Sequence, residues 1–248
     1  MDELFLFLTY LTVGMKIKDL GHRYQIHPST VSRIITTWAN FLYSVLGSLS
    51  IWLSEEDVKK RLPQVFKSFP DTQVIVDCTE LRCQTPADPL LQSEMYSQYK
   101  SHSTMKAMVG MAPHGPITFV SKLYGGSISD KELFKRSGIQ HLLTKDMAVM
   151  ADKGFLIDDC IPGKVYRPPF LSSKQSQMPA DQVHRTQEIA RVRIHIERVI
   201  RRVKENHLFD TIIPLSIASH INQLFVVACI LSNYQCRALV KEWAREDS

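Results

Sequence analysis

The chain has 248 residues, of which 44% are hydrophobic and 22% charged, and its formal net charge is +5. This ordinary globular composition excludes a disordered protein and is enough for a large core. Five scattered cysteines without a C-x-x-C pair argue against structural zinc and fit a reducing compartment. Acidic residues precede the first apolar run, the wrong order for a signal peptide, and no apolar run is long enough to cross a membrane. We therefore expect a soluble, intracellular protein with no membrane partner.

Helical patterns dominate the first 68 residues, which contain few strand signals. Ser29 follows a proline and is a favourable N-cap for the third of four expected helices. Ser54 lies three residues before Asp57, close to the spacing of a capping box, and we expect it to open the fourth. The four predicted helices cover residues 3–12, 15–24, 30–46 and 54–68.

Two of these helices, within residues 15–43, have the pattern of a helix-turn-helix. In that motif the N-terminal end of the second helix contacts bases and phosphates. Short polar and basic side chains suited to DNA gather at this end, namely Ser29, Thr30, Ser32, Arg33 and Thr36. The alternative is a plain helical hairpin that packs against the rest of the protein.

After Phe69 and Pro70 the pattern changes to the short apolar runs typical of strands, and we place a domain boundary there. The two predicted domains are a small all-helical one over 1–68 and a larger one over 69–248. The expected strands are 73–79, 104–112, 117–124, 147–151 and a short one at 165–166. The expected helices run from Ser129-Asp130 to Leu143, over 181–206 and over 216–242. This order predicts an α/β fold with a mixed sheet flanked by helices.

Three acidic residues occur where a metal site would need them. Asp77 and Asp152 each follow a short apolar run that predicts a buried strand, and Glu197 lies in a basic helix. An ionised carboxylate at the core of a sheet is costly unless it is paired or binds a metal. An all-oxygen ligand set of this kind suits Mg²⁺ or Mn²⁺. The alternative is three separate structural acids, with Glu197 ion-paired to Arg193 and Arg201 along its helix.

Positive charge gathers around Glu197. Between Arg185 and Lys204 there are seven Arg and Lys residues against two Glu residues. We expect Arg191, Arg193 and Arg201 to contact phosphates, and Lys100 and Lys122 are weaker candidates for the same role. The alternative is a solvated helix face with intrahelical ion pairs.

Several motifs together carry a family resemblance. They are VIVDCTE, Tyr99-Lys100, the stretch 106–110, ITFVSKLYGGSISDK, VMADKGF and IARVRIHIERVIRRVK. These motifs resemble the DDE-superfamily endonucleases of the Harbinger-like transposase group, in continuous order over about residues 70–210, and the N-terminal helices resemble that family's helix-turn-helix. The resemblance implies an RNase H-like core that cleaves DNA strands with divalent metal, two Mg²⁺ or Mn²⁺ ions. By position it assigns the catalytic and metal-binding roles to Asp77, Asp152 and Glu197.

The resemblance also implies partners and leaves alternatives open. DNA is the expected partner, the expected location is the nucleus with the cytoplasm also open, and a homo-oligomer or a separate DNA-binding partner protein would fit. Met1 falls almost at the first helix, so an upstream domain could be missing. We interpret Asp130, in the SISDK motif, as the cap of the following helix and a neighbour of the site. A relative that binds DNA or protein without cleavage is the main alternative, and an enzyme acting on RNA fits the core but not the N-terminal helices.

Overall fold

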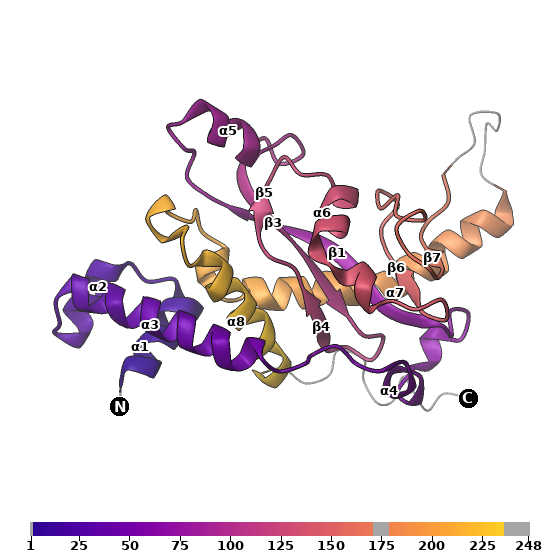
Figure 1. Ribbon diagram of the computed structural model, residues 1–248, viewed down its shortest axis with the longest axis horizontal. Helices are drawn as coiled ribbons and strands as arrows, with labels where there is room; N and C mark the ends of the chain where they lie inside the picture. Colours follow the sequence, from indigo (N-terminus) through magenta and orange to yellow (C-terminus); the bar gives the residue numbers. More distant parts are fainter. Residues whose placement is uncertain (1, 171–178, 236–248) are drawn as a thin grey trace.

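The computed structural model describes residues 2–170 and 179–235 (Figure 1). The N-terminal part forms four helices, α1 (Asp2–Val13), α2 (Ile17–Tyr24), α3 (Pro28–Gly47) and α4 (Glu55–Lys60). The strands that follow are β1 (Thr72–Arg82), β2 (Tyr96–Ser97), β3 (His102–Met111), β4 (Ile117–Val120), β5 (Tyr124–Gly125), β6 (Ala148–Met150) and β7 (Val165–Tyr166). The remaining α-helices are α5 (Pro89–Met95), α6 (Asp130–Ser137), α7 (Ala180–Lys204) and α8 (Ile221–Gln235). Among the described helices, none combines the length and apolar character needed to cross a membrane.

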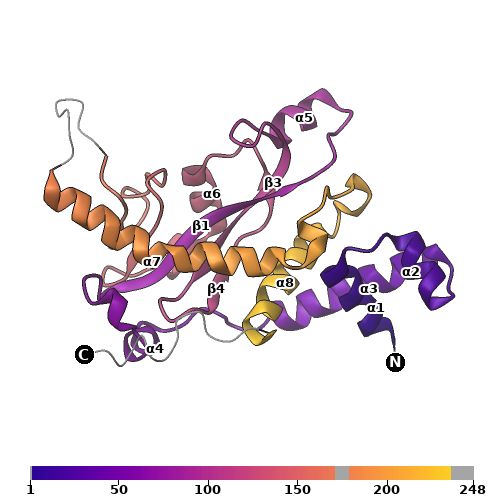
Figure 2. The same ribbon diagram turned by 180° about the vertical axis from the view of Figure 1, so that it is seen from behind.

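The strands form one mixed sheet. Its central path runs β2-β3-β1-β6-β7, and β4 and β5 also pair with β3. Strand β1 is antiparallel to β3 and parallel to β6, and β6 is parallel to β7. Helix α6 lies on one face of this sheet, while α7 and α8 lie on the other (Figures 1 and 2). The predicted class, a mixed sheet flanked by helices and preceded by a small helical region, is confirmed.

Strand β1 is longer than predicted and one of its margins is left free. Its pairing with β6 stops at Ile75, opposite Met150, whereas its pairing with β3 continues to Arg82. Among the described strands, none pairs with β1 on the β6 side over residues 77–81, which we call the free margin of β1. Side chains along this margin point alternately to the two faces of the sheet.

The start of α3 differs from the prediction. His27, rather than Ser29, is the N-cap, because its backbone is extended and its Nδ1 accepts a hydrogen bond from Ser29 N at 3.3 Å. Pro28 is the first helical residue, a position where its missing N–H costs nothing. Pro28 is therefore the first residue of α3 and not part of the turn that precedes the helix.

The fourth predicted helix is capped as expected but is shorter. Ser54 Oγ accepts a hydrogen bond from Asp57 N at 3.1 Å, and α4 then ends at Lys60. Pro63 lies in extended conformation and precedes a short 3-10 helix, η1 (Gln64–Phe66). Extension of the helix to residue 68 was wrong because a proline inside a helix removes a hydrogen bond and clashes with the preceding turn.

Helix α6 also differs in its details. Ser129 is its N-cap, accepting a hydrogen bond from Glu132 N at 3.2 Å, so the expectation that Asp130 caps the helix was wrong. The helix ends at Gly138, whose φ of +80° suits glycine at a helix end, and a 3-10 helix, η2 (Ile139–Leu142), follows. The single helix predicted up to Leu143 is thus divided.

The C-terminal helix α8 starts later than predicted, after two 3-10 helices, η3 (His207–Phe209) and η4 (Leu215–Ile217). The end predicted at residue 242 lies outside the described residues. Helix α5 and the short strand β2 were not predicted, and the single strand predicted over 117–124 is divided into β4 and β5.

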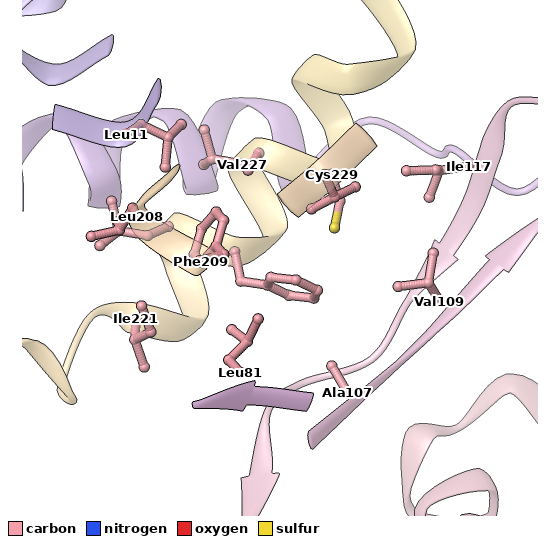
Figure 3. Packing of buried hydrophobic residues seen from close by; sticks show 14 of the residues in the cluster. Leu11, Leu81, Ala107, Val109, Ile117, Leu208, Phe209, Ile221, Val227 and Cys229 are labelled. Atoms are coloured by element: carbon pink, nitrogen blue, oxygen red, sulfur yellow. The ribbon is translucent and has the colours of Figure 1, made fainter. Parts of the chain in front are cut away.

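The main core joins the N-terminal helices to the sheet through α8. In Figure 3, Leu11 of α1 lies beside Val227 of α8, and Leu81 and Val109 approach the same cluster from the sheet. The rings of Phe209 and Phe225 meet edge to face, with their centroids 5.6 Å apart. Helix α8 is therefore apolar on several sides because it lies between two packing partners. The predicted boundary near residue 69 stays a prediction, although this core crosses it.

Two side chains fasten α8 to the sheet. Asn233 accepts a hydrogen bond from Ile117 N at 2.8 Å and donates one to Ile117 O at 2.9 Å. Asn222 accepts one from Leu123 N at 3.0 Å. Polar backbone groups at the outer side of β4 are thereby satisfied by α8.

We expect Asn233→Ala to lower the free energy of unfolding by about 1–3 kcal/mol, because both backbone groups of Ile117 would lose their partner. Urea unfolding measures this change, with Asn40→Ala, an exposed asparagine on α3, as the matched control. Equal stability of the two variants would contradict the role of this contact.

Candidate active site

Asp77 lies in the middle of β1 and not at a strand end as predicted. The polar residues after it suggested the end of a strand, but Leu81 is fully buried and β1 continues to Arg82. The Asp77 side chain is on the face covered by α7, since Ile75 and Leu81, which share its parity, belong to the core on that face. Its Oδ1 accepts a hydrogen bond from Cys78 N at 2.8 Å.

Asp152 follows β6 and lies on the same face. Ile75 and Met150 are partners in the parallel ladder, and the two aspartates each come two residues later. Asp152 Oδ1 accepts a hydrogen bond from Lys153 N at 2.7 Å, and its backbone carbonyl accepts one from Phe155 N at 3.0 Å. The turn after β6 thus holds this carboxylate next to β1.

Helix α7 brings the third acid and a buried arginine across β1, as Figure 2 shows for the helix itself. The Arg193 side chain is only 10% exposed, and its Nη1 lies 2.9 Å from Asp152 Oδ1. Glu197 is one helical turn further along α7 and is exposed. Arg193 thus pairs with Asp152, and the alternative of an intrahelical pair between Arg193 and Glu197 is not seen among the ion pairs of the described residues.

The electrostatics of Asp77 show that these groups act on one another. Burial raises the pKa of Asp77 to about 6, against an ordinary value of 3.8. The charge of Arg193 and the hydrogen bond from Cys78 N lower this pKa, while the charges of Asp152 and Glu197 raise it. A buried carboxyl whose pKa is shifted by burial and by named charged neighbours is a candidate for a functional site.

The donor chemistry fits a hard divalent cation, but the side chains do not converge on one point. Among the described residues, no three His, Cys, Asp or Glu side chains form a group that could hold a metal ion. One carboxylate of the predicted set is bound by Arg193. Asp77, Asp152 and Glu197 supply only oxygen donors, the kind that Mg²⁺ and Mn²⁺ prefer. Their role as ligands stays a prediction.

Asp130 lies near the turn after β6 but on the other face of the sheet. Its carboxylate pairs with Lys106 Nζ at 2.7 Å, and its Oδ2 is 3.8 Å from where a Cβ on Gly154 would lie. Burial lowers the pKa of Lys106, but the hydrogen bond and the negative charge of Asp130 raise it by more, so the pKa of Lys106 is raised overall. Cys78 faces the same side, away from Asp77, as its alternation along β1 predicts, and burial raises its thiol pKa.

The polar residues predicted to contact DNA lie mostly at the surface. On α3, Ser29, Ser32 and Arg33 are exposed, while Thr30 and Thr36 are half-buried. On α7, Arg191 and Arg201 are exposed, in contrast to Arg193.

The two lysine candidates differ in position. Lys100 is exposed at the tip of the turn between β2 and β3. The pKa of Lys204 is lowered first by the burial of Lys204 and then by the positive charge of Lys100, so the two lysines lie near each other. Lys122 is exposed beyond β4, which is separated from β1 by β3. Lys122 is therefore distant from the carboxylates.

One contact of the site was missed in the sequence. Lys204 is half-buried, and its Nζ donates a hydrogen bond to Glu80 O at 2.9 Å on the free margin of β1. It lies seven residues after Glu197, so it is on the same side of α7 two turns later. Helical spacing from Glu197 could have identified this lysine.

Two family models match the chain. Residues 76–233 match the family model for DDE superfamily endonuclease, and residues 1–48 match the model for the helix-turn-helix of DDE superfamily endonuclease. The first match covers more than half of the chain, so the protein belongs to the DDE superfamily endonuclease family, and the predicted resemblance is confirmed. A search of curated proteins gave no match.

The raised pKa of Asp77 predicts a pH-dependent cost in stability. Between 3.8 and about 6 the folded chain holds this proton more tightly than the unfolded chain, so stability falls as the pH rises through that range. We expect Asp77→Asn to match the wild type at lower pH and to exceed it in stability at neutral pH, in metal-free buffer. Urea unfolding across this range tests the difference.

The control Asp146→Asn removes an exposed carboxylate just before β6 and reports the general effect of losing one negative charge. A stability gain of the same size in both variants would refute the buried carboxyl as the cause.

Proposed function

We propose that the protein is a DNA endonuclease that uses Asp77, Asp152 and Glu197 to hold divalent metal and hydrolyse phosphodiester bonds, leaving a 3′-OH. Family membership supports nuclease chemistry in general. The observation that carries the finer proposal is the placement of the three acids: Asp77 and Asp152 each lie two residues beyond the paired Ile75 and Met150, and α7, which carries Glu197, packs on β1. These three groups come from β1, from the end of β6 and from α7.

The chain's own residues position the reacting groups. Asp77 is fixed within a central strand and Asp152 by the turn after β6, which are rigid places for metal ligands. When bound, two Mg²⁺ or Mn²⁺ ions would activate water and stabilise the leaving oxygen. The exposed Arg191 and Arg201 on α7 would bind flanking phosphates through charge-assisted hydrogen bonds.

Arg193 has a separate part in this proposal. Its guanidinium compensates the charge of Asp152 and lowers the pKa of Asp77. If Asp77 and Asp152 held divalent metal, the metal would supply positive charge beside these carboxylates, and Arg193 would be placed to contact the phosphate.

The N-terminal helices would bind DNA. The match to the family's helix-turn-helix supports this, and the exposed Ser29, Ser32 and Arg33 lie at the N-terminal end of α3. Thr30 and Thr36 are half-buried beside them and would support the contact. A nuclear location, a homo-oligomer and a separate DNA-binding partner belong to the same proposal, in which the substrate is DNA.

A second function is favoured by one observation. Asp152 is bound by Arg193, and the described carboxylates form no group that could hold a metal. A relative that keeps the fold and binds DNA or protein without cleavage would tolerate this arrangement. Cleavage assays decide between the two.

We expect metal-dependent nicking of supercoiled DNA by the wild type in Mg²⁺ or Mn²⁺ and its loss in Asp152→Ala. The loss should exceed the roughly ten- to hundred-fold that removal of an outer-shell partner costs. Asp146→Ala, at the opposite end of β6, should nick like the wild type. Nicking by neither the wild type nor the control would favour the binding module.

We expect Arg33→Ala to weaken DNA binding and to reduce the slope of log affinity against log salt by about 1, because one phosphate contact would be lost. Fluorescence anisotropy at several salt concentrations measures both. Arg61→Ala, an exposed arginine after α4, is the control. An identical slope in the wild type and both variants would show that α3 does not bind the phosphate backbone through Arg33.

A further inference from the structure

A cavity of about 640 Å³ with both polar and apolar lining lies on the α6 face of the sheet. It is bounded by α5, by the turn between β2 and β3, by residues 126–128 and by side chains of β1 and β3. In Figure 1 these elements meet at the end of the sheet where α5 and β5 are labelled. We propose that this cavity, the Tyr99 pocket, binds an unpaired nucleobase of the DNA strand. The inference rests on the nuclease function proposed above and names a second contact with its substrate.

Two aromatic rings lie at the cavity. Tyr99 is 84% exposed and Tyr96 is 42% exposed, so both rings have area available for a ligand. Lys100 Nζ lies 4.5 Å from the centroid of the Tyr99 ring. An exposed ring beside a cation is the arrangement with which proteins stack a base and bind its phosphate.

The turn that carries Tyr99 is held in place. Ser101 has a φ of +57° and donates from its backbone N to Ser97 O at 2.8 Å, and Lys100 N donates to Ser97 Oγ at 3.2 Å. These contacts keep Tyr99 and Lys100 at the tip of a tight turn. The backbone that carries the ring is thus ordered before any ligand binds, which reduces the entropy lost on binding.

The opposite wall depends on the two glycines of the LYGGS motif. A Cβ on Gly125 would lie 2.4 Å from Glu94 O, and one on Gly126 would lie 2.0 Å from Thr104 Oγ1. Ser127 donates to Glu94 O from both its N, at 3.1 Å, and its Oγ, at 2.7 Å. The end of α5 can therefore approach the sheet closely, and the wall is formed before any ligand arrives.

The lining offers neutral hydrogen-bonding groups. In the part of the chain that the structure describes, the side-chain amides of Gln92 and Gln98 have no partner within the protein. The two charged residues that also line the cavity are already engaged, since Glu80 Oε2 accepts from Thr104 Oγ1 at 2.8 Å and Lys106 pairs with Asp130. Side-chain amides both donate and accept hydrogen bonds, so they suit the Watson–Crick edge of a base. In a duplex that edge is paired with the opposite base, so only an unpaired base offers it to the protein.

The cavity is within reach of the carboxylates. Glu80, which lines it, comes three residues after Asp77 on the free margin of β1, and three residues of strand span about 10 Å. About three nucleotide steps of 3.4 Å cover that distance. Lys204 crosses this margin to Glu80 O and lies near Lys100, so positive charge continues from α7 to the Tyr99 pocket. A DNA strand bound at Asp77 that crosses the free margin of β1 could therefore place a base in the Tyr99 pocket.

The test is binding of DNA in buffer with EDTA, so that cleavage has no part in the result. The probes are a duplex with one unpaired 2-aminopurine and the same duplex fully paired. We expect the wild type to prefer the unpaired probe and to quench its fluorescence by stacking. Tyr99→Ala should bind that probe roughly ten-fold more weakly, the loss expected for one base–aromatic stack, without quenching. Tyr99→Phe should behave like the wild type.

Tyr234→Ala, which removes an exposed tyrosine from α8, is the matched control and should leave binding unchanged. Equal affinity of the wild type for the two probes, unchanged binding by Tyr99→Ala, or an equal loss in Tyr234→Ala would overturn the proposal. If the wild type prefers the unpaired probe but does not nick DNA in Mg²⁺, the base-binding pocket is supported and the nuclease function is refuted. If it nicks DNA without preferring the unpaired probe, the nuclease function is supported and the base-binding pocket is refuted.

Discussion

The Asp77 carboxyl lies within β1 beneath α7, where burial raises its pKa to about 6. A buried negative charge needs a compensating positive one, and Arg193 provides it while also binding Asp152. The apolar side of α7, including Ile196 and Val199, packs on the same face of the sheet. Helix α7 is therefore fixed over β1 by packing and by charge together, and that position brings Glu197 and the basic residues beside the two aspartates.

Strand β1 carries different groups on its two faces. The acids lie under α7, whereas Glu80 lies on the α6 face, where Lys106 and Asp130 pair. Because β6 is short, the margin between these faces is not covered by another strand, and Lys204 bridges it from α7. In our proposal, a DNA strand follows this margin from the carboxylates to the Tyr99 pocket.

Local sequence patterns predicted the class of fold, most of the larger elements and the Ser54 cap, because hydrophobic periodicity and capping chemistry act over a few residues. One error concerned Pro28, because a proline can either interrupt a helix or occupy its first position. Another concerned Asp77, because polar residues there alternate with buried ones along β1 and do not end the strand. The pair between Arg193 and Asp152 joins residues 41 positions apart and depends on where α7 packs. Spacing along a helix could suggest only its alternative partner, Glu197.

The core described for α8 has one more consequence. The helices that match the family's helix-turn-helix share a continuous apolar cluster with the sheet, from Leu11 through Val227 to Val109. Moving α3 independently of β1 would expose that cluster to water, at roughly 25 cal/mol for each Å² of apolar surface. If α3 binds the DNA, the protein fixes one distance along the DNA. It is the distance between the bases that α3 contacts and the phosphodiester that is cut. Sequences inserted between these two points in the DNA would then move the cut to a different nucleotide instead of being accommodated by a flexible linker.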